Sequence, residues 1–190
     1  MNQNDLSLLK EMCAIHAPSG SEIFVKEFLI DYIQKNQDSW NVKPDLIQGS
    51  DFQDSFILVF GKPRTAIYAH MDSVGYSVGY NNNLIRIGGP QAENGTELVG
   101  VDSQGKIEAK LIIEESEHRG KSLKIDFARI IDRGTTLTYK QEFVVTDNYI
   151  QSCYLDDRLG IWNALKVAET LENGAIVFSA WEEVGGGSVG

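Results

Sequence analysis

The chain has 190 residues, 42% of them hydrophobic, which is enough to bury a substantial core in one or two domains. Its formal net charge of −10 would repel a phosphate backbone or an anionic lipid surface, so neither nucleic acid nor a membrane is an expected partner. We expect no membrane span and no secretion signal. Cys13 and Cys153 are far apart in sequence and predict no disulfide framework, which favours a cytoplasmic protein with reduced thiols.

The N-terminal part predicts two helices interrupted by a proline. Apolar residues recur at helical spacing between positions 6 and 15, and the pattern stops before Pro18 because the residue preceding a proline disfavours the helical conformation. Residues 19–22 (Ser-Gly-Ser-Glu) then predict a capping box, in which Ser19 caps the second helix and Glu22 is the partner three residues later.

Four short runs predict the strands of an α/β sheet, and two of them are so apolar that burial on both faces is expected. The runs are residues 42–48, 55–60, 65–69 and 175–180, and the last two are the almost wholly apolar ones. Polar groups follow these two, with His70 and Asp72 after the first and Glu182 and Glu183 after the second. Because ligands bind at the carboxyl ends of strands in open α/β sheets, we expect these groups to meet there.

The stretch between these two strands has a different character. It is rich in glycine and contains runs that alternate between apolar and polar residues, at 106–113, 123–127 and 135–145. Alternation at period two between turn signals predicts a small antiparallel β domain. We therefore expect three segments: a first part of an α/β domain at 1–75, an inserted, β-barrel-like domain at 76–149, and a second part of the α/β domain at 150–190.

Two adjacent carboxylates, Asp156 and Asp157, stand directly before the helical pattern of residues 160–171. One interpretation is a helix N-cap, since an Asp there accepts free N–H groups and meets the positive end of the helix dipole. The other is a metal site, because a dication favours ionised carboxylates and removes their repulsion. Together with His70 and the Glu pair, Asp156 predicts a site for two divalent metals. For Asp157, capping or structural support is the favoured role.

Four stretches, in this order, resemble the signatures of a known family, the co-catalytic metallo-aminopeptidases of the tetrahedral, or glutamyl, aminopeptidase family, once also labelled endoglucanase-like. They are residues 17–22, 69–75, 155–160 and 182–185. Each motif alone is weak, but their order is specific, and so is the insertion between the His and Asp-Asp motifs. That placement favours this family over the related carboxypeptidase-like and single-domain aminopeptidase families. The resemblance implies a mixed-sheet, zinc-peptidase-like α/β domain.

The resemblance also implies a role for each site residue. His70, Asp156 and Glu183 would bind two divalent metal ions, with Asp156 bridging them and the Asp156–Asp157 peptide bond cis. Asp72 would orient His70 from behind. Glu182 would be the general base, taking a proton from the metal-bridging water as that water attacks the peptide carbonyl. Imidazole with carboxylates suits zinc, with cobalt or manganese as alternatives.

One departure from the family pattern bears on activity. The family needs a further carboxylate and a further His beyond the Glu-Glu motif, whereas this chain ends at Gly190. We therefore expect an incomplete α/β domain, and a site that is incomplete in this chain alone. The leading hypothesis is a metal-dependent aminopeptidase that forms homo-oligomers through the β insertion. The alternatives are a related metal-dependent deacylase or carboxypeptidase, and a non-catalytic relative that binds peptides or partner subunits.

Overall fold

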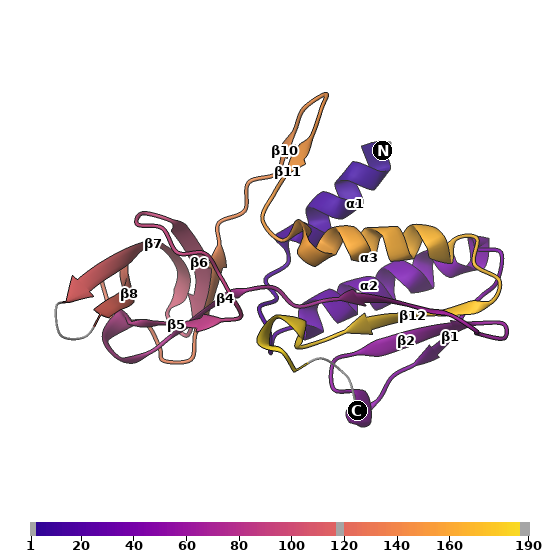
Figure 1. Ribbon diagram of the computed structural model, residues 1–190, viewed down its shortest axis with the longest axis horizontal. Helices are drawn as coiled ribbons and strands as arrows, with labels where there is room; N and C mark the ends of the chain where they lie inside the picture. Colours follow the sequence, from indigo (N-terminus) through magenta and orange to yellow (C-terminus); the bar gives the residue numbers. More distant parts are fainter. Residues whose placement is uncertain (1–2, 117–119, 187–190) are drawn as a thin grey trace.

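The computed structural model describes residues 3–116 and 120–186, so the last four residues of the predicted segment 150–190 lie outside the described part (Figure 1). An α/β part and a separate six-stranded sheet lie side by side. The helices of the α/β part are α1 (Gln3–Ala14), α2 (Ile23–Asn36) and α3 (Leu155–Ala168). Its strands are β1 (Asp45–Ile47), β2 (Phe56–Phe60), β3 (Ala66–His70) and β12 (Gly174–Ser179). None of the helices in the described ranges is long and apolar enough to cross a membrane.

The four strands form one mixed sheet in the order β1-β2-β12-β3. β1 and β12 both run antiparallel to β2, whereas β12 and β3 are parallel. The predicted α/β class is thereby confirmed. The parallel pair is in a register that places Ser179 opposite His70, so both strands end at the same edge of the sheet.

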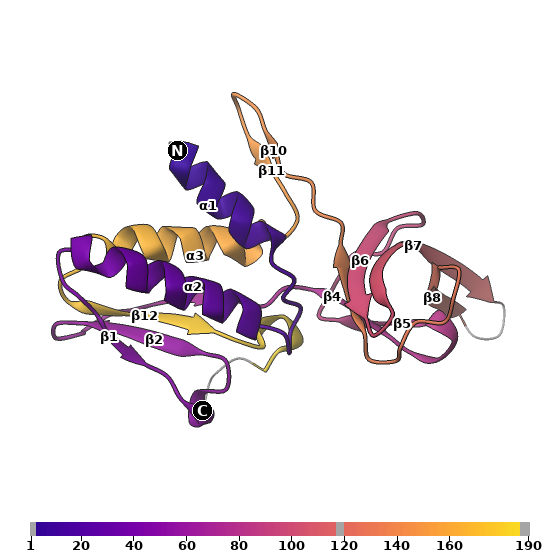
Figure 2. The ribbon, with the colours of Figure 1, turned by 180° about the vertical axis from the view of Figure 1, so that it is seen from behind.

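The helices cover one face of this sheet. All three lie on the same side of it in both views (Figures 1 and 2). Against them pack the alternate side chains of the central strands, and Phe56 of β2 stacks on Phe178 of β12 with ring centroids 4.8 Å apart. The main core is built from fully buried residues of the helices and strands, among them Leu9, Met12, Val25, Leu29, Phe56, Leu58, Phe60, Ile161, Ile176 and Phe178.

The prediction that residues 65–69 are buried on both faces is wrong. Tyr68 is 70% exposed, because β3 is the edge strand of this sheet and Tyr68 points away from the helix-covered face. Residues 175–180 come closer to the expectation, since β12 is flanked by β2 and β3 and only 9% of Val177 is exposed. How deeply a strand is buried depends on whether other strands lie on both of its sides, and its own sequence does not reveal this.

The second sheet has the order β5-β4-β9-β6-β7-β8, with neighbouring strands antiparallel. Its strands are β4 (Gly75–Val78), β5 (Leu84–Ile87), β6 (Glu97–Asp102), β7 (Gly105–Ser116), β8 (Gly120–Asp126) and β9 (Thr136–Tyr139). A bridge between Asn83 and Lys124 brings its two ends together, so the sheet is nearly closed. Gly100 fits this curvature, because a Cβ there would lie 2.6 Å from Leu137. The predicted barrel-like β structure is confirmed.

A small hairpin and several 3₁₀ turns lie outside these two sheets. A two-stranded hairpin, β10 (Val144–Val145) and β11 (Ile150–Gln151), projects from the chain between β9 and α3 (Figure 1). Four 3₁₀ turns are described at Gln37–Ser39, Ser50–Phe52, Tyr80–Asn82 and Glu182–Val184. Cys13 and Cys153 are both free thiols.

A histidine after α1 joins the α/β part to the six-stranded sheet. The Nε2 atom of His16 lies 2.8 Å from the hydroxyl oxygen of Thr136, and Nδ1 lies 3.1 Å from that of Thr138, both on β9. Burial lowers the pKa of His16 below its usual value, so the folded protein favours the neutral imidazole.

The His16 contact makes stability depend on pH. The folded-state pKa lies below the unfolded value of about 6.5, so stability is complete above that value and falls as the pH drops through and below it. We predict that the unfolding free energy of wild type falls more steeply between pH 7 and pH 5 than that of His16→Gln. Urea unfolding at several pH values measures the unfolding free energy of both proteins. The other titrating groups are the same in both, so their contributions cancel in the difference. Parallel curves would contradict the prediction.

Candidate functional site

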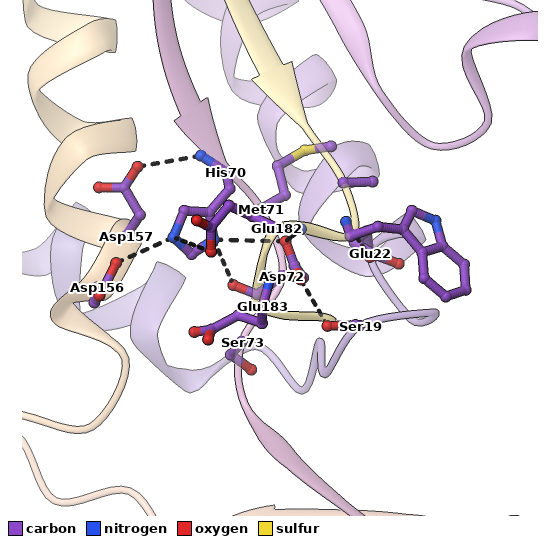
Figure 3. Close-up of polar contacts among 12 residues, drawn as sticks. Ser19, Glu22, His70, Met71, Asp72, Ser73, Asp156, Asp157, Glu182 and Glu183 are labelled. Carbon is purple, nitrogen blue, oxygen red and sulfur yellow. Dashed lines mark hydrogen bonds and ion pairs between the residues drawn. The ribbon is translucent and has the colours of Figure 1, made fainter. Parts of the chain in front are cut away.

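The candidate site lies where β3 and β12 end side by side (Figure 3). The pairing continues past the strands, with the main-chain N–H of Met71 donating to the carbonyl of Ser179 at 2.7 Å. The segments that follow each strand therefore start from one edge of the sheet. The N-terminal end of α3 reaches the same edge, because the Asp157 carboxylate accepts a bond from the main-chain N–H of His70.

His70 is at the centre of this cluster. Its Nε2 atom lies 3.0 Å from Oδ1 of Asp156 and 3.9 Å from Oε2 of Glu182. Its Nδ1 atom faces Asp72, at 3.2 Å from the main-chain oxygen and 3.5 Å from the carboxylate. Burial lowers the pKa of His70, but hydrogen bonds to Asp72 and Asp156, together with the charges of Asp72 and Asp157, outweigh it and raise the pKa to about 9. The imidazole is therefore held at both nitrogens by groups that attract a positive charge.

Asp72 is fully buried and connects three segments. Its Oδ2 accepts bonds from the Ser19 hydroxyl at 2.6 Å and from the main-chain N–H of Glu183 at 3.0 Å. Its Oδ1 accepts the N–H of Glu182 at 3.1 Å. Burial raises the pKa of Asp72, but bonds from His70, Ser19 and the two amides outweigh this and place it below its usual value. Asp72 thus does more than orient His70, since it also holds the main chain of Glu182 and Glu183.

The two aspartates in the first turn of α3 have non-helical main-chain conformations and separate roles in the structure. The Asp157 carboxylate accepts the N–H of Gly160 at 3.0 Å as well as that of His70 at 3.1 Å, which is the capping and supporting role that the sequence favoured. A Cβ at Gly160 would lie 1.9 Å from the Asp157 carboxylate, so a larger residue there would displace this side chain. Asp156 instead extends its carboxylate toward His70 with the side chain 88% exposed. The peptide bond between the two is cis, as the resemblance implied.

Glu182 and Glu183 lie in the short turn after β12. The residues on either side of the turn, Trp181 and Gly185, have left-handed main-chain conformations with φ of 67° and 73°. The Glu182 side chain is 59% exposed, whereas Glu183 is half-buried. Burial raises the pKa of Glu183, the charge of His70 lowers it, and the neighbouring carboxylates raise it further. The turn therefore carries one open carboxylate and one whose charge would be favoured by a nearby cation.

The described residues offer only part of a metal site. Within residues 3–116 and 120–186, no group of three or more His, Cys, Asp or Glu side chains is arranged to hold a metal ion. The closest pair nevertheless fits one. His70 Nε2 and Asp156 Oδ1 are 3.0 Å apart, a few tenths of an ångström less than the ~3.3–3.6 Å between two ligands of a tetrahedral zinc with bonds of about 2.0–2.2 Å. The donor types suit a divalent metal, and further ligands would have to come from elsewhere.

The predicted capping box at residues 19–22 is wrong, and its side chains belong to the site instead. No side-chain cap bond is made at the start of α2. The Ser19 hydroxyl donates to Asp72, while the Glu22 carboxylate accepts the main-chain N–H of Gly20 at 2.8 Å and of Trp181 at 3.1 Å. The sequence pattern identified two side chains that bind main-chain or carboxylate groups, but it assigned them the wrong partners.

The comparisons with known proteins relate part of the chain to one family. Residues 118–189 match the family model described as M42 glutamyl aminopeptidase. The predicted resemblance to the glutamyl aminopeptidases is confirmed. None of the curated proteins compared with the chain matches it.

Solved structures show the same fold. The chain matches the TET aminopeptidase from the marine sediment archaeon Thaumarchaeota archaeon SCGC AB-539-E09 with a TM-score of 0.76 and 18% identity, over 96% of this chain and 59% of that one. It matches the TET1 peptidase of Pyrococcus horikoshii with a TM-score of 0.68 and 22% identity, over 95% of this chain and 62% of that one. The chain thus spans about three fifths of the length of these solved structures.

The position of Asp72 leads to a stability prediction. In Asp72→Asn, an NH₂ group replaces one of the two oxygens that accept the N–H groups of Glu182 and Glu183, which leaves a buried donor unpaired. We predict that unfolding requires about 1–3 kcal/mol less free energy than in wild type. Urea unfolding measures the change, and Asp45→Asn on exposed β1 is the matched control. Equal stability of the two variants would show that Asp72 does not connect these segments.

Proposed function

We propose that this chain is part of a metal-dependent aminopeptidase that removes N-terminal residues from peptides. One observation carries the proposal. In a chain that resembles the glutamyl aminopeptidases, an imidazole and several carboxylates, remote in sequence, meet at the shared end of β3 and β12. On this proposal the α/β part is a zinc-peptidase-like domain and residues 76–149 are a domain inserted into it.

The proposed mechanism assigns a task to each side chain. His70, Asp156 and Glu183 would hold two divalent cations. Zinc suits these donors best, with cobalt or manganese as alternatives. The cations would polarise the peptide carbonyl and acidify the attacking water when bound. Further ligands would come from outside the residues that the structure describes.

The chain's own residues prepare the site for this chemistry. Asp72 holds Nδ1 of His70, which directs Nε2 toward Asp156 and the open side of the cluster. Glu182 has an exposed carboxylate whose Oε2 lies 3.9 Å from that same Nε2. This exposed position beside His70 supports a role for Glu182 as the general base that takes a proton from water.

Two other functions use the same cluster. A related deacylase or carboxypeptidase would differ in its substrate, so comparing peptides with blocked and free amino termini separates it from an aminopeptidase. A non-catalytic relative that binds peptides or partner subunits predicts no bound metal even in the complete protein, which elemental analysis tests.

Assembly into homo-oligomers is part of the proposal. The P. horikoshii TET1 peptidase is described as assembling into a tetrahedron or a large octahedral shell, and the related structure PhTET1-12s as a dodecamer. PhTET1-12s matches with a TM-score of 0.72 and 22% identity, over 97% of this chain and 62% of that one. We propose that the six-stranded sheet mediates such contacts here. The free thiols of Cys13 and Cys153 fit a reducing compartment such as the cytoplasm.

Replacing the proposed base tests the mechanism. In the complete protein, supplied with zinc, cobalt or manganese, Glu182→Gln is expected to lower kcat for peptide hydrolysis by about 10²–10⁴-fold, because the amide cannot accept the proton. Metal content by elemental analysis should stay unchanged, since Glu183 rather than Glu182 is the proposed ligand. The exposed Glu172→Gln is the control. Equal rates in wild type and Glu182→Gln would remove Glu182 from the mechanism.

A further inference from the structure

Two side chains from the connection between α1 and α2 hold the turn that carries Glu182 and Glu183. Glu22 accepts the main-chain N–H of Trp181 at 3.1 Å. Ser19 acts through Asp72, donating at 2.6 Å to the carboxylate that accepts the N–H groups of both glutamates. Three consecutive main-chain amides of the turn are thus fixed by this arrangement (Figure 3).

The environment of Glu22 is costly for a carboxylate. The residue is fully buried, and its carboxylate accepts hydrogen bonds from the main-chain N–H groups of Gly20 and Trp181. Burial raises the pKa of Glu22, even though these N–H bonds lower it. Because burying a carboxylate costs free energy even when it is hydrogen-bonded, its presence here indicates a task that an apolar residue cannot perform.

The two hydrogen-bond donors that face Glu22 explain why a carboxylate is needed at this position. Gly20 and Trp181 both present N–H donors, one to each oxygen of Glu22, so both positions require an acceptor. A glutamine would turn its NH₂ group toward one of them. The Trp181 main chain also needs support, because its φ of 67° lies in the left-handed region, which is unfavourable for a bulky residue.

We propose that Ser19 and Glu22 are positioning residues, which set the main chain of residues 181–183 so that the carboxylates of Glu182 and Glu183 face His70. The catalytic consequence of this inference rests on the proposed function. The positioning of residues 181–183 does not depend on it. The sequence predicted that both side chains would cap α2, but neither makes a cap bond there and both bind groups of the site instead.

Amide hydrogen exchange of this chain tests the positioning directly. In Glu22→Gln and in Ser19→Ala, exchange at the amides of residues 181–183 is expected to rise about tenfold or more, while exchange in β12 and α3 stays at the wild-type rate. The matched controls are Glu27→Gln and Ser21→Ala, on neighbouring side chains that are exposed or half-exposed. Unchanged exchange at residues 181–183, or a rise throughout the protein, would overturn the proposal. Should Glu22→Gln not fold, Ser19→Ala decides alone.

A second measurement separates positioning from a merely structural role. In the complete protein loaded with Co²⁺, both variants are expected to lower kcat about tenfold or more with KM within twofold of wild type, and to shift the visible Co²⁺ absorption bands. Wild-type kcat and bands in variants with faster exchange would overturn the catalytic part. If wild type neither binds Co²⁺ nor hydrolyses peptides, the proposed function fails, while the exchange result still decides the positioning.

Discussion

The parallel pairing of β3 with β12 is the constraint on which the site depends. Its register sets His70 opposite Ser179, so the chain leaves both strands at one edge although more than a hundred residues separate them. In an antiparallel pair the same polar segments would lie at opposite edges. The chain leaves the α/β part after β3, forms the six-stranded sheet, and returns to the α/β part before α3. The size of this sheet therefore does not disturb the register that brings the site together.

Asp72 converts this shared edge into a defined arrangement. A single buried carboxylate lies 3.5 Å from the imidazole of His70 and accepts the N–H groups of Glu182 and Glu183. It joins the segment after β3 to the segment after β12 through bonds that water cannot easily replace, because Asp72 is fully buried. The orientation of the imidazole and the position of the glutamates are thereby linked, and a change in one is transmitted to the other.

The sequence predicted the strands and the polar groups that follow them, because apolar runs ended by His70 or Glu182 carry both signals locally. It could not predict that Tyr68 is exposed, since flanking by other strands is a property of the sheet. It also misassigned Ser19 and Glu22, because the pattern of a capping box is the same whether the bond partner is the helix or a distant carboxylate or amide. The His16 contact with β9 had no local signal at all.

The charge balance of the cluster explains why the sequence pattern pointed to cations. Asp72, Asp156, Asp157, Glu182 and Glu183 gather around the imidazole of His70, whose pKa is raised to about 9 largely by Asp72 and Asp156 against the effect of burial. One imidazolium can offset only one of these negative charges. Burial together with neighbouring carboxylates raises the pKa of both Asp157 and Glu183, so their ionised forms are disfavoured as the cluster stands. A dication would replace the proton of His70 and stabilise these carboxylates at once, which is the electrostatic argument behind the proposed metal site.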